Sequence, residues 1–278
     1  GHAPELRGRD LSAYAAAGIR SDHECVTAEE ALEKISKGMY VMIREGSATR
    51  DLARLVPAVT PRTAPRFLLC SDDRHPTDLA EEGHIDRSIR LLVDAGVDPL
   101  DAIAMSSLNA ARYFGLRNSG AIAPGYKADF VAASDLRAFE AEVVIKSGQI
   151  VAEGGRLVRA VENRPAVLRD SVNIKWLTEE DFRIPAEGRR IRVIEARPRT
   201  LITGEIQTEP PVREGLCVSD VSRDLLKIFV IERHKGSGNI GKGFITGLGL
   251  KRGAIGSTIS HDSHNMILVG ADDASIFK

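Results

Sequence analysis

Short apolar runs separated by helical patterns constrain the fold of residues 1–115 more than any other feature. Two runs, MYVMI at residues 39–43 and FLLC at residues 67–70, have the continuous apolar character of strands buried on both faces of a parallel sheet. A shorter strand candidate at residues 18–22 precedes them. Strands that alternate with helices form βαβ units, so the chain predicts a parallel α/β sheet.

Helix start signals lie between these runs. The candidate caps are Asp10 for a helix to residue 17, Thr27 with Glu30 as a capping box, Ser47 for a helix to about residue 56, and Asp98 before Pro99 for a segment to about residue 115. The helix after Thr27 is expected to bury one apolar face, made of Ala28, Ala31, Leu32 and Ile35. Residues 85–95 are amphipathic, which predicts a further helix.

Polar residues follow each predicted strand and precede the next helix. They are Asp22, His23 and Glu24 after the first strand, Arg44, Glu45 and Ser47 after the second, and Asp72, Asp73 and His75 after the third. Because parallel strands end at the same edge of a sheet, we expect these side chains to meet there, where α/β barrels carry their chemistry. The alternative is that each group is only a solvated turn, since Asp and Ser are common turn residues.

Two imidazoles and a carboxylate form a candidate metal site. His23 and Asp72, with His2 as a third member, make a mixed nitrogen and oxygen set of the kind that binds Zn, Mn or Fe. Such a metal lowers the pKa of a bound water to about 7. A nearby carboxylate can then accept a proton and pass it to a leaving group. The alternative, that His23 is a structural histidine, stays open at this point.

The pattern changes at residue 121, where Gly and Pro turns begin to separate short strand patterns. Ser147 and Gly148 form a candidate hairpin turn within this region, which predicts a small β module. Residues 162–169 read as a linker. Beyond them, the spacing of apolar residues predicts an α+β or mostly β domain.

Two motifs in this last domain have more than one interpretation. The stretch GSGNIGK at residues 236–242 fits the Gly-x4-Gly-Lys pattern of a phosphate-binding loop, but Gly243 stands where that loop needs Ser or Thr for Mg²⁺. A glycine-rich turn beside a strand is therefore favoured. His261 and His264 form either a further metal site or lid over the substrate, or a polar cluster at a domain interface.

Composition excludes several classes of function. The formal net charge of −1 gives no basic surface for nucleic acid or for an anionic membrane. No apolar run approaches the roughly 18 residues that a membrane span needs. The first residues, GHAPELRGRD, lack the pattern of a signal peptide. Cys25, Cys70 and Cys217 form no CxxC pair, so we expect a reducing cytoplasm.

Several longer stretches together resemble bacterial-type adenine deaminases of the amidohydrolase superfamily. They are GHAPELRGRDLSAYAAAGIRSDHECVTAEEAL, MYVMIREGSA, FLLCSDDRHPTDLAEEGHID, NAARYFGL, GAIAPGYKADFV and GNIGKGFITGLGLKRGAIGSTISHDSHN. The resemblance covers nearly the whole chain. It implies an α/β fold with part of a (β/α)8 metal-dependent hydrolase barrel (strands 5/6 to 8) at residues 1–115. A β-sandwich module at 116–163 and an α+β C-terminal domain at 164–278 would follow.

The resemblance implies hydrolytic deamination of adenine to hypoxanthine and ammonia at a binuclear divalent centre of Mn or Fe, with Zn as an alternative. Carried over by position, the implied metal ligands are His2, His23 and Asp72, and Asp72 is also the catalytic residue that moves a proton. The candidates to bind the purine are Glu24, Glu45, Ser47, Asp73 and His75.

The chain departs from the superfamily pattern at two places. The His-x-His pair after the first barrel strand and the bridging ligand after the fourth have no counterpart in it. We therefore expect the sequence to be part of a longer enzyme whose activity needs the preceding half of the barrel. The alternatives are a related hydrolase of cyclic amides and an inactive barrel fragment that serves as a binding module. For the leading interpretation, an adenine deaminase, we expect a cytoplasmic homodimer.

Overall fold

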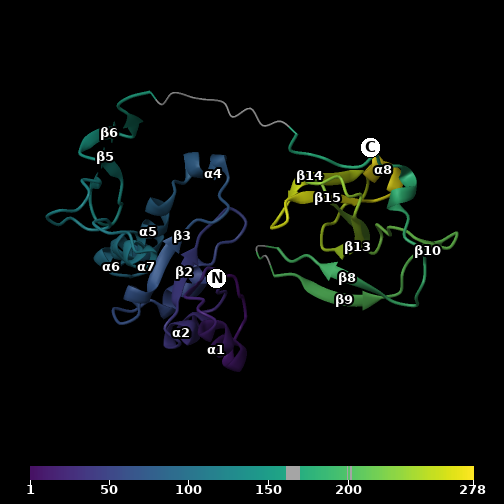
Figure 1. The fold of residues 1–278 in the computed structure, drawn as a ribbon, viewed down its shortest axis with the longest axis horizontal. Helices are drawn as coiled ribbons and strands as arrows, with labels where there is room; N and C mark the ends of the chain where they lie inside the picture. The colour runs from purple at the N-terminus through teal and green to yellow at the C-terminus, as the bar shows by residue number, and fades with distance from the viewer. Residues whose placement is uncertain (161–169, 199, 201) are drawn as a thin grey trace. The chain divides into compact units, whose positions relative to one another are not determined.

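The computed structural model describes residues 1–160, 170–198, 200 and 202–278. The chain divides into two units, Gly1–Glu162 and Asn163–Lys278, and each is described by itself. Figure 1 labels their elements. The linker predicted at residues 162–169 lies outside the described residues. Among the described residues, no helix has both the length and the apolar character that crossing a bilayer requires.

The first unit contains the predicted parallel sheet. Its strands are β1 (Ser21–Asp22), β2 (Tyr40–Arg44) and β3 (Phe67–Cys70), in the order β1-β2-β3. Both strand pairs are parallel, with Asp22 opposite Val41 and Arg44 opposite Cys70. All three strands are largely buried, as their apolar runs predict. The prediction of an α/β unit is confirmed.

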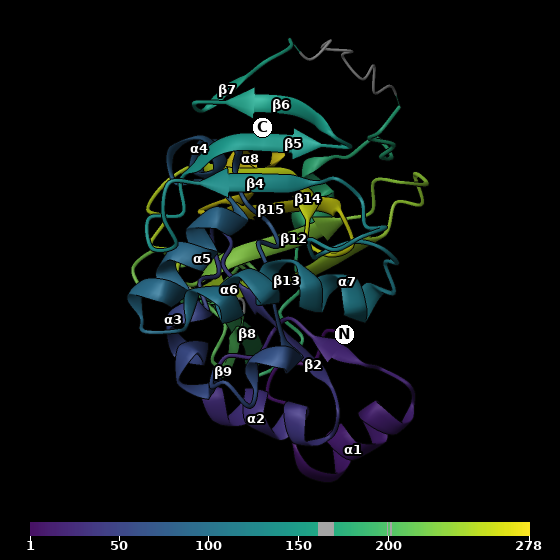
Figure 2. The ribbon, with the colours of Figure 1, turned by 90° about the vertical axis from the view of Figure 1, so that its left-hand side faces the viewer.

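Helices connect and cover these strands. They are α1 (Gly8–Ala16), α2 (Ala28–Ser36), α3 (Leu52–Leu55), α4 (Pro76–Glu81), α5 (Ile85–Asp94), α6 (Pro99–Ser106) and α7 (Leu108–Phe114), with 3-10 turns η1 (Val56–Ala58) and η2 (Ala64–Arg66). Helices α5, α6 and α7 contact β3, whereas α2 and α3 contact β2. Helices α5, α6 and α7 lie toward the viewer in Figure 2.

The helix start predictions are confirmed at two sites and wrong at two others. Thr27 accepts a hydrogen bond from the Glu30 amide, and Asp98 caps α6. Helix α1 starts three residues earlier than predicted, with Arg7 at its N-cap, so Asp10 lies in its first turn rather than at its cap. Ser47 does not cap a helix, because its hydroxyl is engaged with Asp78 and α3 begins only after Asp51.

The buried face of α2 differs from its predicted apolar stripe. Leu32 is 42% exposed, whereas Glu30 and Lys34 are buried. The Glu30 carboxylate accepts hydrogen bonds from the Val26 and Glu5 amides and pairs with Lys34. The capping box is therefore only half formed, since Glu30 is drawn toward a buried cation.

The predicted β module is a four-stranded antiparallel sheet. Its strands are β4 (Phe130–Ala133), β5 (Ala141–Lys146), β6 (Gln149–Glu153) and β7 (Arg156–Leu157), in sequence order. Ser147 and Gly148 join β5 to β6 with φ values of 51° and 78°, which a two-residue type I′ hairpin requires. The hairpin prediction is confirmed.

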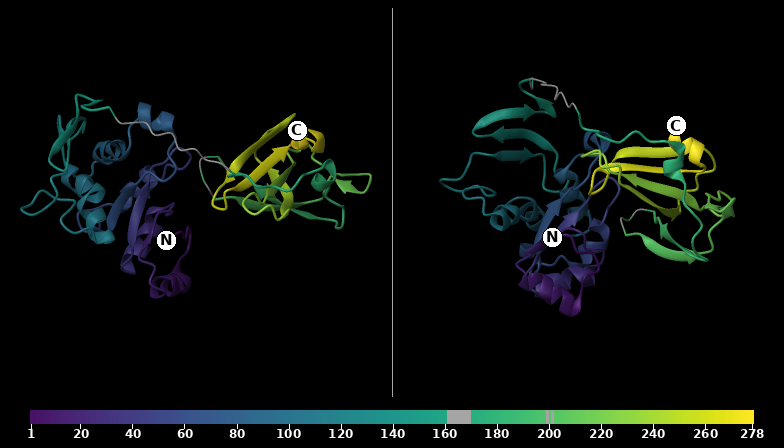
Figure 3. Two further views of the ribbon diagram at one scale, coloured as in Figure 1. Left: turned by 45° about the horizontal axis from the view of Figure 1, so that its top comes forward. Right: turned by 45° about the vertical axis from the view of Figure 1, so that its right-hand side comes forward.

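The second unit is mostly β in its described residues. A six-stranded sheet has the order β14-β15-β12-β13-β8-β9, in which only β8 and β13 pair in parallel. Its strands are β8 (Ile191–Glu195), β9 (Gly204–Thr208), β12 (Leu226–Ile231), β13 (Ile240–Thr246), β14 (Ala254–Ser260) and β15 (Asn265–Gly270). The smaller elements are β10 (Val212–Arg213), β11 (Leu216–Cys217), η3 (Glu179–Phe182) and α8 (Asp273–Phe277). Figure 3 gives two further views of this sheet.

The glycine-rich stretch at residues 236–242 forms a turn and the start of a strand. Gly236 and Gly238 have φ values of 62° and 79° in the connection from β12 to β13. Lys242 already lies within β13 and donates to the Arg183 carbonyl. A phosphate-binding loop needs a helix after its lysine, so the favoured prediction of a turn beside a strand is confirmed.

Asn109 should make a large contribution to the stability of the first unit. Its buried amide nitrogen donates to the carbonyls of Ala64 and Phe67, at 2.9 and 3.0 Å, and so ties α7 to β3. Asn109→Ala should lower the free energy of unfolding by about 1–3 kcal/mol, because both buried carbonyls lose a donor. The exposed substitution Arg112→Ala on the same helix should change it by no more than about 0.5 kcal/mol. Urea unfolding measures both, and equal effects would contradict the assignment.

Glu232 should make the second unit sensitive to acid. Backbone amides of Ser237, Lys235 and His234 donate to its carboxylate and lower its pKa from 4.5 to about 2. A group with a lowered folded-state pKa stabilises the fold above its ordinary pKa, and this stability is lost as the pH falls toward the folded value. Glu232→Gln should therefore lower the melting temperature at pH 7, with the difference from the parent disappearing by about pH 2. Glu209→Gln, at an exposed carboxylate of the same unit, is the control and should show no such pH-dependent difference.

Candidate metal site

His23 directly follows β1 and has a defined tautomer. Its Nδ1 lies 2.7 Å from the carbonyl oxygen of Gly1, which can only accept, so Nδ1 carries the proton. In the neutral imidazole, the lone pair of Nε2 then faces Asp72 Oδ2, at 3.6 Å. A histidine that binds a metal commonly donates its other ring N–H to a carbonyl in this way. The lone pairs of the imidazole and the carboxylate face each other, an arrangement that a cation between them would satisfy.

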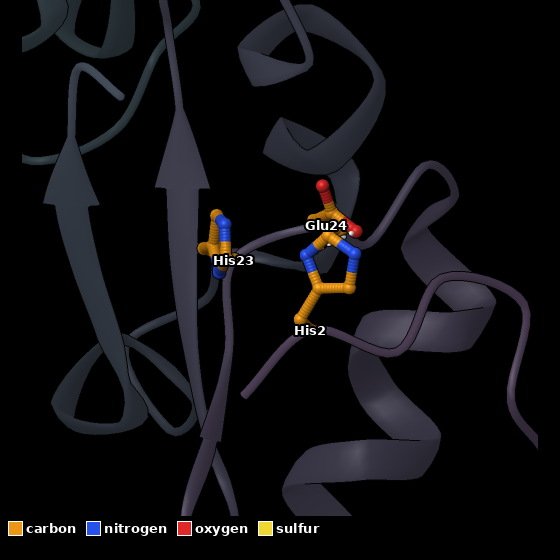
Figure 4. Close-up of side chains that lie close together, drawn as sticks. All are labelled: His2, His23 and Glu24. Carbon is orange, nitrogen blue, oxygen red and sulfur yellow. Dashed lines mark ion pairs between the residues drawn. The ribbon is translucent and has the colours of Figure 1, made fainter. Parts of the chain in front are cut away.

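His2 and Glu24 complete a cluster with His23. His2 Nδ1 lies 3.2 Å from Glu24 Oε2, and the two imidazole centroids are 5.9 Å apart. Potential ligand atoms of all three residues lie within 4.8 Å of one another. Figure 4 shows the side chains gathered beside the end of the strand. Two imidazoles with a carboxylate are a donor set that suits a first-row divalent metal.

Asp72 reaches this cluster from the loop after β3. Its backbone has a φ of 56°, in the left-handed region that Asp tolerates better than most residues. The Asp73 amide donates to Oδ1 at 2.9 Å, which leaves Oδ2 toward His23 and Arg44. The structure thus groups two of the predicted ligands, His2 and His23, with Glu24, which the sequence suggested only as a purine contact. The third, Asp72, lies beside His23 but outside this group.

Arg44, at the end of β2, balances the acidic side of the cluster. Its Nη1 lies 3.1 Å from both Glu24 Oε1 and Asp72 Oδ2, and its Nη2 lies 3.1 Å from Asp51 Oδ2. Burial acts to lower the pKa of Arg44, but the hydrogen bonds to these carboxylates outweigh burial and raise it. The guanidinium is therefore a permanent positive charge placed among three carboxylates.

The remaining predicted purine contacts lie in the loops after β2 and β3. Glu45 is buried and pairs with Arg87 at 2.8 Å. Ser47 accepts a hydrogen bond from the His75 amide at 2.8 Å, which joins the two loops. Asp73 and His75 are exposed. The roles of these residues toward a substrate stay predictions.

His261 and His264 lie in the connection between β14 and β15 of the second unit. Their ring centroids are 5.9 Å apart. Among the described residues, the groups of three or more side chains that could hold a metal do not include them. The choice between a site and a polar cluster stays open for this pair.

A buried ion cluster beneath the site was not predicted from the sequence. Lys34 Nζ lies 2.6 Å from Asp22 Oδ2 and 2.6 Å from Glu30 Oε1, and all three side chains are at most 1% exposed. Burial acts to raise the pKa of Asp22, but the hydrogen bond and charge of Lys34 outweigh it and lower that pKa. The i, i+4 spacing of Glu30 and Lys34 was visible in the sequence, yet it is usually a surface pattern.

Fold and site together define a class. The chain contains a parallel sheet with side chains that could hold a metal near the carboxyl ends of its strands, the end at which α/β barrels carry their chemistry. The model of the amidohydrolase family matches residues 1–151, more than half of the chain. The chain belongs to the amidohydrolase family, which confirms the predicted resemblance and the expectation of part of a hydrolase barrel. The model of the adenine deaminase C-terminal domain matches residues 200–278.

Curated relatives match the chain along its whole length. It is 48% identical over 279 residues to an adenine deaminase of Methanothrix thermoacetophila, covering 100% of this chain and 49% of that protein. It is 47% identical over 278 residues to an adenine deaminase of Nitratidesulfovibrio vulgaris strain DP4, covering 99% of this chain and 48% of that protein. The chain thus spans about half the length of these relatives. Among solved structures, a beta-aspartyl dipeptidase from Fervidobacterium islandicum AW-1 aligns with a TM-score of 0.42 and 19% identity, over 51% of this chain and 42% of that one.

Arg44 should be essential to the stability of the site. Arg44→Met removes the cation that three carboxylates share and leaves them close together, so it should lower the free energy of unfolding by about 3–5 kcal/mol. Arg54→Met is the matched control. Arg54 also pairs with Asp51, at 3.6 Å, but its side chain is half-exposed to solvent. This control should cost no more than about 1 kcal/mol. Denaturant unfolding compares them, and an Arg44→Met protein as stable as the control would contradict the role given to Arg44.

Proposed function

We propose that this chain supplies metal ligands and a proton-accepting carboxylate for the hydrolytic deamination of adenine to hypoxanthine and ammonia. One observation carries the proposal. His2, His23 and Glu24 offer ligand atoms within 4.8 Å of one another, and Asp72 lies 3.6 Å from His23, in a chain that aligns along its whole length with proteins named adenine deaminase. The match of residues 200–278 to the adenine deaminase C-terminal domain supports the same substrate.

The donor set supports a divalent cation in this site. Family membership implies such a cofactor, and we propose Mn or Fe in a binuclear centre, with Zn as an alternative. His2 and His23 would each offer a neutral ring nitrogen, and Glu24 or Asp72 would offer oxygen. When bound, the cation would lower the pKa of a water into the neutral range.

Asp72 is the proposed proton acceptor. Its Oδ1 accepts from the Asp73 amide, whereas Oδ2 faces His23 and also accepts from Arg44. Ionised Asp72 can accept a proton from water through Oδ2, which lies 3.1 Å from Arg44 Nη1. Asp72 would then return this proton to the departing amino group, so that water and adenine become hypoxanthine and ammonia.

Side chains in the loops after the three strands are proposed to surround the substrate. Glu24, Glu45, Ser47, Asp73 and His75 are the side chains proposed to contact the purine. Ser47 and His75 are joined to each other, so a change at either should alter the shared loop position. The whole protein is proposed to be a cytoplasmic homodimer, as the family resemblance implies.

A chimera tests the function directly, because the chain spans about half of its relatives. The matching half of the Methanothrix thermoacetophila adenine deaminase would be replaced by this chain. The chimera should release ammonia from adenine with Mn²⁺ present. Asp72→Asn should lower kcat by about 100- to 10,000-fold, the usual contribution of a general base. Asp94→Asn, at an exposed position of α5, is the control and should leave kcat unchanged. Ring opening of a dihydropyrimidine without deamination of adenine would contradict the proposal.

A further inference from the structure

The segment that carries His2 has no regular structure of its own. Among the described residues, 1–7 belong to no helix or strand, and the His2 side chain is 62% exposed. The His2 amide donates to the Tyr14 hydroxyl, and the Gly1 carbonyl accepts from His23. Three further backbone contacts of the segment lead to buried charges beneath the site.

The buried cluster of Lys34, Asp22 and Glu30 binds the backbone of this segment at both the amide and the carbonyl of Ala3. Lys34 Nζ donates to the Ala3 carbonyl at 2.7 Å, while the Ala3 amide donates to Asp22 Oδ1 at 3.1 Å. The Glu5 amide donates to Glu30 Oε1 at 2.7 Å. Hydrogen bonds to buried charged groups are among the strong ones in proteins, so they fix the backbone next to His2.

The same cluster also fixes the second imidazole. Asp22 is the last residue of β1 and directly precedes His23. Its two carboxylate oxygens divide the contacts, since Oδ1 accepts from Ala3 and Oδ2 accepts from Lys34. One buried ammonium is therefore linked, through a single carboxylate, to the residues adjacent to both His2 and His23.

Asp22, Cys25 and Glu30 also lie close enough together to form a metal-ligand group of their own. Lys34 already occupies that position, because its ammonium contacts both carboxylates at 2.6 Å. Without it, two buried carboxylates would face each other uncompensated, which is strongly unfavourable. The cluster is therefore a pair of buried salt bridges centred on Lys34, and not another metal site.

We infer that Lys34 is a positioning residue that holds His2 against His23 at the distance one cation can bridge. Lys34 touches neither imidazole and takes no part in chemistry. It fixes the backbone before helix α1 against the end of β1, which sets the 5.9 Å separation of the two rings. The consequence for metal binding rests on the proposed function, whereas the positioning itself does not.

Proton NMR of the full chain tests the inference without any metal. The ring protons of His2 and His23, assigned with His→Gln variants, should show a mutual nuclear Overhauser effect in the parent protein. Lys34→Met should abolish this effect while the signals of His234 and His264 stay in place. Glu30→Gln keeps the shape of the side chain and is the second variant if Lys34→Met does not fold. Glu30→Gln should weaken the same nuclear Overhauser effect, because it removes one of the two carboxylates that pair with Lys34.

Lys227→Met is the matched control. Lys227 is also a buried lysine, with its Nζ 2.6 Å from Asp273, but it lies in the second unit. This variant should leave the effect between His2 and His23 intact. Retention of the effect in Lys34→Met, its loss in Lys227→Met, or its absence from the parent protein would each overturn the inference.

Titration with Mn²⁺ then separates positioning from function. In the parent protein both imidazoles should broaden at the same Mn²⁺ concentration, whereas in Lys34→Met the His2 signal should need about 10- to 100-fold more. If the ring contact is lost in the variant but the parent imidazoles do not respond to Mn²⁺, the positioning role stands and the proposed metal function fails.

Discussion

Two buried cations, Lys34 and Arg44, pair with the carboxylates that gather at the carboxyl ends of β1, β2 and β3. Lys34 pairs with Asp22 and Glu30, and Arg44 pairs with Glu24, Asp51 and Asp72. Carboxylates this close would repel one another and take up protons if they lacked partners. Removing one partner of a buried ion pair is far more costly than losing an exposed pair. The sheet brings these groups to one edge, where the two cations offset their negative charges.

This balance of charge has a chemical consequence for the imidazoles. The two carboxylates near the imidazoles, Glu24 and Asp72, already share a cationic partner in Arg44. Nδ1 of His23 donates to the Gly1 carbonyl, so in the neutral imidazole Nε2 offers its lone pair to a ligand. Neutral imidazoles and ionised carboxylates are the forms that bind a divalent metal. The electrostatics of the edge therefore agree with the amidohydrolase family to which the chain belongs.

The sequence predicts what depends on short-range rules and misses what depends on distant partners. The apolar runs at β2 and β3, the Asp98 cap and the 147–148 hairpin follow from patterns within a few residues, and all four are found. Lys34 is buried because it donates to the Ala3 carbonyl and to Asp22. Helical periodicity cannot predict these contacts, because both partners lie outside the helix. Ser47 was expected to cap a helix, but Asp78, which follows the next strand, engages its hydroxyl instead. His2, His23 and Asp72 could be named from their places after strands and from a family resemblance, whereas the grouping of Glu24 with the two imidazoles needed coordinates.

The most direct test of the site is anomalous diffraction from crystals of this chain soaked in MnCl₂, recorded on both sides of the Mn absorption edge. The expected result is an anomalous peak between His2, His23 and the carboxylates of Glu24 and Asp72, within bonding distance of His23 Nε2. A peak elsewhere, such as beside His261 and His264, with none at His23, would contradict a shared cation at the end of β1.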